Sequence, residues 1–156
     1  MTTQIKVIVA DDDELDRYVA KRVLRKEAQI GTVGECGDGR QLIDLMRSPQ
    51  FAEEWGPHPP PVLVLLDINM PLMSGFDVLN ELSTPSPLVD ADGATVTPEK
   101  VYVVLMLTSS VSFHDRQRAA SHDLVVGYIE KPLDSVKLSR ALAGLYPTEI
   151  GPDAAS

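Results

Sequence analysis

Five short apolar runs, separated by segments with helical spacing, constrain the fold of this chain more than any other feature. The runs are Ile5 to Ala10, Thr32 to Cys36, Val62 to Leu66, Val101 to Leu107 and Leu124 to Ile129. Several of them are apolar throughout rather than alternating, which is typical of parallel strands that are covered by helices on both faces. The runs therefore predict a five-stranded parallel sheet and argue against most all-β sandwiches.

The segments between the runs are predicted to be helices. Apolar residues recur at helical spacing over Glu14 to Ala28, and shorter helices are predicted over Gln41 to Met46 and Phe76 to Leu82. A capping box predicts a helix from Ser112 to Ala120, and Asp134 would cap a last helix. The repeated order predicts a (βα)5 α/β fold, doubly wound by right-handed crossovers, with ligands at the carboxyl ends of the strands.

Length and composition fit one domain. The 156 residues are 44% hydrophobic and 24% charged, which are values of a globular protein. We expect a domain over residues 1–147 and a flexible tail over 148–156. Two proline-rich stretches, 48–61 and 83–100, lack helical periodicity and are expected to be surface loops, either passive insertions or binding sites for a partner.

Charge narrows the range of partners. A formal net charge of −9 disfavours nucleic acid and anionic membrane surfaces, so no partner of either kind is expected. Cys36 is the single cysteine, which excludes an intrachain disulfide. The sequence shows neither a signal-peptide pattern nor an apolar run long enough to cross a bilayer. We therefore expect a cytoplasmic protein that binds other proteins.

Five polar residues follow or end the predicted strands. Asp11 and Asp12 come after the first run, while Asp67, Thr108 and Lys131 come at the ends of the third, fourth and fifth. Grouped carboxylates are unfavourable unless a cation or a proton is present, and Mg²⁺ prefers such oxygen ligands. A lysine and a hydroxyl suit phosphate oxygens. The pattern predicts a magnesium and phosphate site at this edge of the sheet.

Four motifs in this order resemble the receiver domain of bacterial two-component response regulators, over roughly Ile5 to Leu145. They are Val7-Ile8-Val9-Ala10-Asp11-Asp12; Leu65-Leu66-Asp67-Ile68-Asn69-Met70-Pro71 with Gly75; Met106-Leu107-Thr108-Ser109; and Tyr128-Ile129-Glu130-Lys131-Pro132. The resemblance implies a flavodoxin-like fold with strand order 2-1-3-4-5, the order known for the chemotaxis regulators of this family. We expect a stand-alone signalling protein, because 156 residues are too few for a receiver domain and a folded output domain.

The resemblance assigns the phosphoryl chemistry to Asp67. This residue would accept the group from a phosphohistidine on a sensor histidine kinase or a histidine phosphotransfer protein. Asp12 would bind Mg²⁺ directly and Asp11 largely through water, with Asp67 and the main-chain carbonyl of Asn69 as further ligands. The expected cofactor is Mg²⁺ alone.

The resemblance gives three more residues a role. Lys131 would contact the phosphoryl oxygens, and Thr108 would turn its hydroxyl towards them. Thr108 and Tyr128 would then form the switch that changes the binding surface, although Tyr128 also suits simple packing. The peptide bond between Lys131 and Pro132 resembles one that is cis in this family.

Alternative functions remain open at this level. A haloacid-dehalogenase-like phosphatase also uses a nucleophilic aspartate, Mg²⁺, a hydroxyl and a lysine, but it needs an acid two residues later, where this chain has Asn69. A degenerate receiver that acts only as a binding module would not need all five site residues. We expect a phospho-acceptor rather than a turnover enzyme, with output through an unknown protein target or through a phosphorelay.

Overall fold

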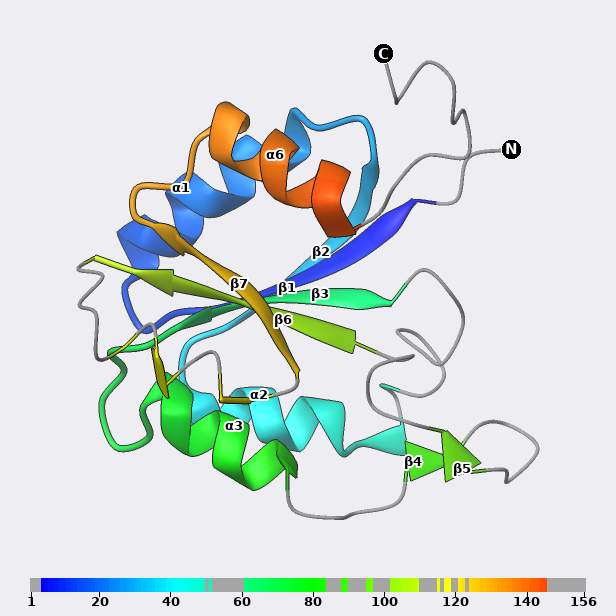
Figure 1. Cartoon of the computed structure of the whole chain (residues 1–156), viewed down its shortest axis with the longest axis vertical. Coiled ribbons are helices and arrows are strands. Elements are labelled where there is room, and N and C mark those ends of the chain that lie inside the picture. The colour runs from blue at the N-terminus through cyan, green and yellow to red at the C-terminus, as the bar shows by residue number, and fades with distance from the viewer. Residues whose placement is uncertain are drawn as a thin grey trace.

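A five-stranded parallel sheet with helices on both faces forms the centre of the computed structural model (Figure 1). The structure describes residues 4–49, 51, 61–83, 88–89, 95–96, 102–109, 115, 117–118, 121–122 and 124–145. The sheet order is β2-β1-β3-β6-β7. These strands are β1 (Ile5–Ala10), β2 (Ile30–Cys36), β3 (Val62–Asp67), β6 (Tyr102–Thr108) and β7 (Val125–Glu130). Counted along the chain they give the order 2-1-3-4-5, which confirms the predicted fold.

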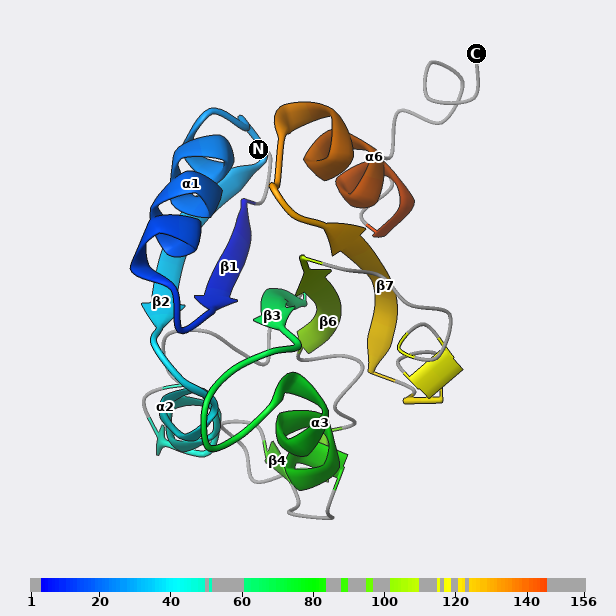
Figure 2. The same cartoon turned by 90° about the vertical axis from the view of Figure 1, so that its left-hand side faces the viewer.

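The helices form one layer on each side of the sheet, as Figure 2 shows. Helices α1 (Glu14–Arg25) and α6 (Ser135–Leu145) cover one face, and α2 (Gly39–Met46) and α3 (Gly75–Ser83) cover the other. Because successive strand residues point to opposite faces, each strand contributes to two cores. Val7 of β1 packs in the core beneath α1 and α6, whereas its neighbour Ile8 packs in the core beneath α2 and α3.

Aspartates cap the first two helices. Asp13 accepts hydrogen bonds from the backbone N–H groups of Leu15 and Asp16 at the start of α1. Asp38 accepts one from the backbone of Gln41 at the start of α2. Each cap satisfies N–H groups that have no partner within the helix. The caps fix where the chain turns from strand to helix at the carboxyl edge of the sheet.

The boundaries differ from the predicted ones around the first crossover. Helix α1 ends at Arg25 rather than at Ala28, and β2 begins at Ile30 rather than at Thr32. The backbone N–H of Ile30 donates to the carbonyl oxygen of Glu27, 3.1 Å away, in a turn that brings the chain into the sheet. This turn explains the shorter helix. The strand is longer than predicted because Ile30 is buried and belongs to it. Gly31, which follows Ile30, interrupts the apolar run from which the strand was predicted.

Some described residues within the two proline-rich stretches take part in the fold. Phe51, in the first, is buried, and its ring packs edge-on against Tyr102 with the ring centroids 6.5 Å apart. In the second, β4 (Leu88–Val89) pairs antiparallel with β5 (Thr95–Val96), so the expectation of a loop alone is wrong there. Two residues per strand are too few for a periodic signal. Most of the predicted helix 112–120 and all of the predicted tail 148–156 lie outside the described residues.

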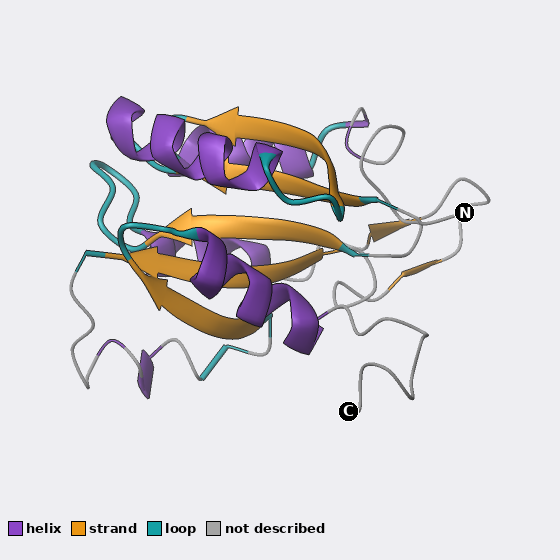
Figure 3. Cartoon of the chain, turned by 90° about the horizontal axis from the view of Figure 1, so that it is seen from above, coloured by secondary structure: helices purple, strands orange, loops and turns teal. Residues whose placement is uncertain are grey.

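The short hairpin lies at the end of the sheet where the strands begin. Figure 3 shows the arrowheads of the sheet strands at one end of the molecule and the β4 and β5 arrows at the other. Helix α3 begins near the carboxyl end of β3 and runs towards the end of the sheet where the hairpin lies (Figure 1).

Candidate functional site

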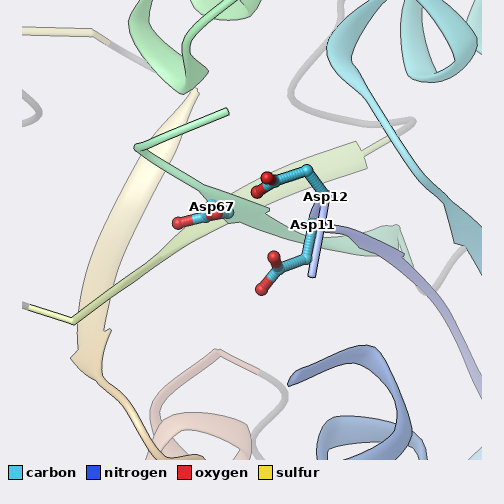
Figure 4. A group of neighbouring side chains, drawn as sticks. All are labelled: Asp11, Asp12 and Asp67. Carbon is cyan, nitrogen blue, oxygen red and sulfur yellow. The ribbon is translucent and has the colours of Figure 1, made fainter. Parts of the chain in front are cut away.

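Three carboxylates meet at the carboxyl edge of the sheet. The register pairs Ala10 of β1 with Leu66 of β3. Asp11 and Asp67 directly follow these two residues in the sequence and are therefore neighbours. One carboxylate oxygen from each of Asp11, Asp12 and Asp67 lies within 4.8 Å of the others. Figure 4 shows the three side chains at the ends of the two strands. Asp11 and Asp67 are buried, 1% and 3% exposed, whereas Asp12 is exposed.

Backbone N–H groups hold the two buried carboxylates in place. Asp11 Oδ1 accepts from the backbone N–H of Asp13 at 2.9 Å, and Asp67 Oδ1 accepts from that of Asn69 at 3.2 Å. The carbonyl oxygen of Asp11 accepts from Arg17 Nη1 at 2.6 Å. Each acid is therefore held by the turn that follows its own strand.

Lys131 brings a positive charge to these acids. The peptide bond between Lys131 and Pro132 is cis, as the resemblance implies. The backbone N–H of Lys131 donates to the carbonyl oxygen of Thr108 at 2.7 Å, which joins β7 to β6 just below the site. The Nζ atom lies 2.6 Å from Asp11 Oδ2 and 3.4 Å from Asp67 Oδ1. The side chain, 13% exposed, thus spans the two buried acids.

A third acid contacts the lysine, and this contact was not predicted from the sequence. Asp16 Oδ2, in the first turn of α1, lies 2.9 Å from Lys131 Nζ. Asp16 belongs to the acidic segment that runs from Asp11, and in the sequence it suggests only a helix start. The contact joins residues 115 positions apart, so no local pattern reveals it.

The pKa values of Asp67 and Lys131 are both shifted in the site. Burial, together with the nearby charge of Asp11, raises the pKa of Asp67 to about 7 against the opposing effect of Lys131. Burial acts to lower the pKa of Lys131, but hydrogen bonds to Asp11 and Asp16 outweigh burial and raise it. The lysine is therefore permanently charged, whereas Asp67 changes charge near neutral pH.

The other predicted residues lie on adjoining strands. Thr108 is buried and follows Leu107, the register partner of Asp67, so it ends the neighbouring strand beside the acid. Tyr128 pairs with Met106 in the sheet and is 38% exposed on the edge strand β7. The structure thus brings Asp67 and Thr108 to adjacent strand ends and leaves Tyr128 partly in solvent.

A glycine allows the loop between Asp67 and Gly75 to close tightly. The backbone N–H of Gly75 donates to the carbonyl oxygen of Ile68 at 2.8 Å. A Cβ atom at Gly75 would lie 2.5 Å from the carbonyl oxygen of Asp67 and 3.0 Å from the Cα atom of Ile68. Helix α3 can therefore begin this close to Asp67 only because residue 75 has no side chain.

The donor set fits a hard divalent cation. All three acids offer oxygen, two are buried, and their mutual repulsion is what a cation would relieve. The pKa of Asp67 is raised first by burial and then by the charge of Asp11, and a cation would oppose both effects. The carboxyl edge of a parallel α/β sheet therefore carries an acid cluster and a lysine, an arrangement that is compatible with binding of a divalent cation.

Comparison with known families identifies the class of protein. A model of the response regulator receiver domain matches residues 7–143, and the chain belongs to this family. The phosphatase alternative is thereby set aside, because the family accounts for both the fold and the four motifs. Among curated proteins, the chain is 25% identical over 139 residues to the transcriptional regulatory protein DegU of Brevibacillus brevis, which covers 89% of this chain and 49% of that protein.

Other relatives show how varied the surrounding architectures are. The chain is 26% identical over 137 residues to a protein-glutamate methylesterase/protein-glutamine glutaminase of Methanococcus maripaludis, covering 87% of this chain and 31% of that protein. It is 29% identical over 142 residues to the sensory/regulatory protein RpfC of Xanthomonas campestris, covering 90% of this chain and 16% of that protein. The chain spans about half or less of the length of these relatives.

Solved structures confirm the fold. A two-component response regulator from Cytophaga hutchinsonii superposes with a TM-score of 0.75 at 20% identity, covering 94% of this chain and 99% of the other. The chemotaxis response regulator CheY4 of Vibrio cholerae gives a TM-score of 0.66 at 23% identity, covering 92% and 99%. At these identities the likeness concerns the fold alone.

Proposed function

We propose that this receiver accepts a phosphoryl group on Asp67. A carboxylate oxygen of Asp67 attacks the phosphorus of a phosphohistidine on a sensor histidine kinase or a histidine phosphotransfer protein. The bond between phosphorus and the imidazole nitrogen breaks, and the electron pair stays on that nitrogen, which then takes a proton. The position of Asp67 between an acid pair and Lys131 is the observation that carries this proposal.

Mg²⁺ is the cofactor that the acid cluster suits. Asp12 and Asp67 would bind it directly, Asp11 largely through water, and the main-chain carbonyl of Asn69 would complete the protein ligands. When bound, the ion neutralises charge on the carboxylates and on the phosphoryl oxygens. The exposed position of Asp12 leaves room for the water ligands that Mg²⁺ retains.

Lys131 and Thr108 would stabilise the transferred group. Lys131 provides fixed positive charge beside Asp67, and the buried Thr108 provides a hydroxyl from the next strand end. Donors that are already in place where negative charge develops need little reorganisation during the reaction. These two residues would therefore stabilise the negative charge that phosphorylation adds.

Labelling with acetyl phosphate and Mg²⁺ tests the proposal. The wild type should gain the mass of one phosphoryl group and migrate more slowly on a phosphate-retarding gel. Asp67→Asn should not be labelled, because an amide of nearly the same shape is not a nucleophile. Asp12→Ala should weaken Mg²⁺ binding and slow labelling. Undiminished labelling of Asp67→Asn would refute the assignment.

The proposed output is a change of the surface near β7. Phosphorylation adds a group of about −1.5 to −2 charge with three acceptor oxygens, which would draw the Thr108 hydroxyl towards Asp67. Tyr128, half-exposed on β7, would then take a more inward position. NMR of ring-labelled Tyr128 with Mg²⁺ and beryllium fluoride tests this. Identical Tyr128 signals with and without the mimic, or an unimpaired shift in Thr108→Ala, would refute the coupling.

We propose that the chain signals through proteins rather than through turnover of a substrate. It would either bind a target in its phosphorylated form or pass the group on in a phosphorelay. The net charge of −9 disfavours nucleic acid and anionic lipid as direct partners. We place the chain in the cytoplasm because its sequence shows no signal-peptide pattern. None of the helices in the described part of the chain has the length and apolar character needed to cross a membrane.

A further inference from the structure

Lys131 is shared among three carboxylates from three elements. Its ammonium donates to Asp11 at 2.6 Å and to Asp16 at 2.9 Å, while Asp67 lies at 3.4 Å, within ion-pair range. An ammonium has three N–H donors, so two are already engaged away from Asp67. In this arrangement the lysine lies nearer to the helix acid than to the residue proposed to carry the phosphoryl group.

The start of α1 explains why Asp16 reaches the lysine. Asp13 is the N-cap, and Asp16 occupies the third helical position, where an acid commonly turns back to accept from the N–H of the cap residue. Here the N–H of Asp13 donates to Asp11 Oδ1 instead, at 2.9 Å. The carboxylate of Asp16 is thereby released from this local role and pairs with Lys131.

Asp16 stands apart from the acids suited to a cation. The group whose carboxylate oxygens lie within 4.8 Å of one another consists of Asp11, Asp12 and Asp67. A cation held by that group would engage Asp11 and Asp67, the other two partners of the lysine. Asp16 would remain as the acid whose charge acts on Lys131 alone.

We propose that Asp16 is a positioning residue that competes with the phosphoryl group on Asp67 for the ammonium of Lys131. This inference rests on the function proposed above. A phosphoryl group with three acceptor oxygens draws the lysine towards Asp67, and Asp16 opposes that movement. Asp16 therefore weakens the hold of the site on the phosphoryl group, and its charge sets how far the lysine moves on phosphorylation.

Glu14 offers a matched control for this role. Any acid in the first turn of a helix stabilises it through the helix dipole, which would explain Asp16 without reference to Lys131. Glu14 lies in the same turn, carries the same charge and is exposed. If the dipole were the whole explanation, Glu14→Gln and Asp16→Asn would have the same effects.

The contact itself is tested on the metal-free protein. NMR of side-chain ¹³Cε and ¹⁵Nζ labelled lysine should show a shifted Lys131 signal in Asp16→Asn and an unchanged one in Glu14→Gln. The signal is assigned through its loss in Lys131→Arg. A Lys131 signal that does not move in Asp16→Asn, or that moves equally in Glu14→Gln, would overturn the inference.

The competition is tested with beryllium fluoride, a phosphoryl mimic, at Mg²⁺ concentrations that saturate each variant. In a ¹⁹F NMR titration, Asp16→Asn should bind the mimic roughly threefold more tightly than the wild type, a modest gain because the Asp16 side chain is 40% exposed. Asp16→Glu should keep wild-type affinity, and so should Glu14→Gln. Equal affinity of Asp16→Asn and the wild type would overturn the competition.

The two experiments separate this inference from the proposed function. If the wild type bound no beryllium fluoride at all, the proposed function would fail and the competition with it, yet the lysine spectra would still report the Asp16 contact. If the wild type bound the mimic and Asp16→Asn bound it no better, only the role of Asp16 would fall.

Discussion

The charge of Asp67 sets how this protein responds to pH. Burial and the neighbouring Asp11 raise its pKa from 3.8 to about 7, so the folded chain binds a proton here over a range in which the unfolded chain has lost it. Stability falls with rising pH wherever the native state holds more protons. The metal-free protein should therefore lose stability from Asp67 as the pH rises from about 4 to 7.

Asp67→Asn should remove this pH dependence. With Mg²⁺ chelated, the variant should gain on the order of 2 kcal/mol in unfolding free energy relative to the wild type between pH 5 and pH 8, because an amide carries no charge. Urea unfolding at both pH values measures the difference. Mg²⁺ at pH 8 should restore much of the wild-type stability by binding the native state. A difference that does not change with pH would contradict titration of Asp67 between pH 5 and pH 8.

For single residues, the sequence predicted which side chains meet at the edge of the sheet better than it predicted their individual contacts. The ends of parallel strands meet by topology, so the motifs sufficed to bring Asp11, Asp67 and Lys131 together. The role of Asp16 was not predicted because its partner Lys131 lies 115 residues away. An acid in the first turn of a helix is also explained by the helix dipole alone. The raised pKa of Asp67 likewise depends on burial, which the residue type alone does not give.

At the scale of single elements, the cap of α1 should affect the site as well as the helix. Asp13→Ala removes two hydrogen bonds to the first turn and should cost about 1 kcal/mol in unfolding free energy. Because that turn carries Asp16, the Lys131 NMR signal should also shift. Asp38→Ala is the control, since it uncaps α2, which carries no partner of the lysine in the described structure. An equal shift of the Lys131 signal in both variants would contradict a local effect.

The start of α3 should tolerate no side chain. Gly75→Ala places a Cβ atom 2.5 Å from the Asp67 carbonyl oxygen, so the backbone must move, at a cost of about 1–3 kcal/mol in unfolding free energy. Gly144→Ala is the control, because a Cβ there meets nothing within 4 Å and alanine is the better helix former. Thermal unfolding compares the two. Equal stability of Gly75→Ala and the wild type would show that the loop can relax.

Element prediction succeeded for apolar runs of several residues and failed where the run was shortest. The strands of the sheet were all found, although only β1, β3 and β6 bury several consecutive residues. The edge strands β2 and β7 bury fewer residues and were found from shorter or weaker apolar runs. The β4 and β5 pair has two residues per strand, fewer than periodicity requires, and its prolines and glycine suggested a loop. The turn after α1 depends on the hydrogen bond that the backbone N–H of Ile30 donates to the carbonyl oxygen of Glu27. Residue propensities do not predict this bond.

For the molecule as a whole, the sheet separates the site from the inserted hairpin. The acids and Lys131 lie where the strands end, and β4 and β5 lie where they begin (Figures 1 and 3). Helix α3 begins at Gly75 beside Asp67, and the hairpin follows this helix in the sequence. Because β4 and β5 lie at the opposite end of the sheet from the acids, we predict that the inserted segment takes no part in the phosphoryl chemistry. It would be either a passive insertion or a site that recognises a partner.

Replacing residues 84–100 with a short Gly-Ser connector should therefore leave labelling by acetyl phosphate and Mg²⁺ near the wild-type rate. The replacement removes β4 and β5 but keeps α3 and β6, whose residues pack in the cores beneath the sheet. Circular dichroism establishes that the variant is folded, and the same replacement combined with Asp67→Asn should not be labelled. If the insertion serves recognition, transfer from the cognate kinase or binding of a target should fall while labelling by the small donor does not. A large loss of acetyl phosphate labelling in the folded variant would show that the segment reaches the site.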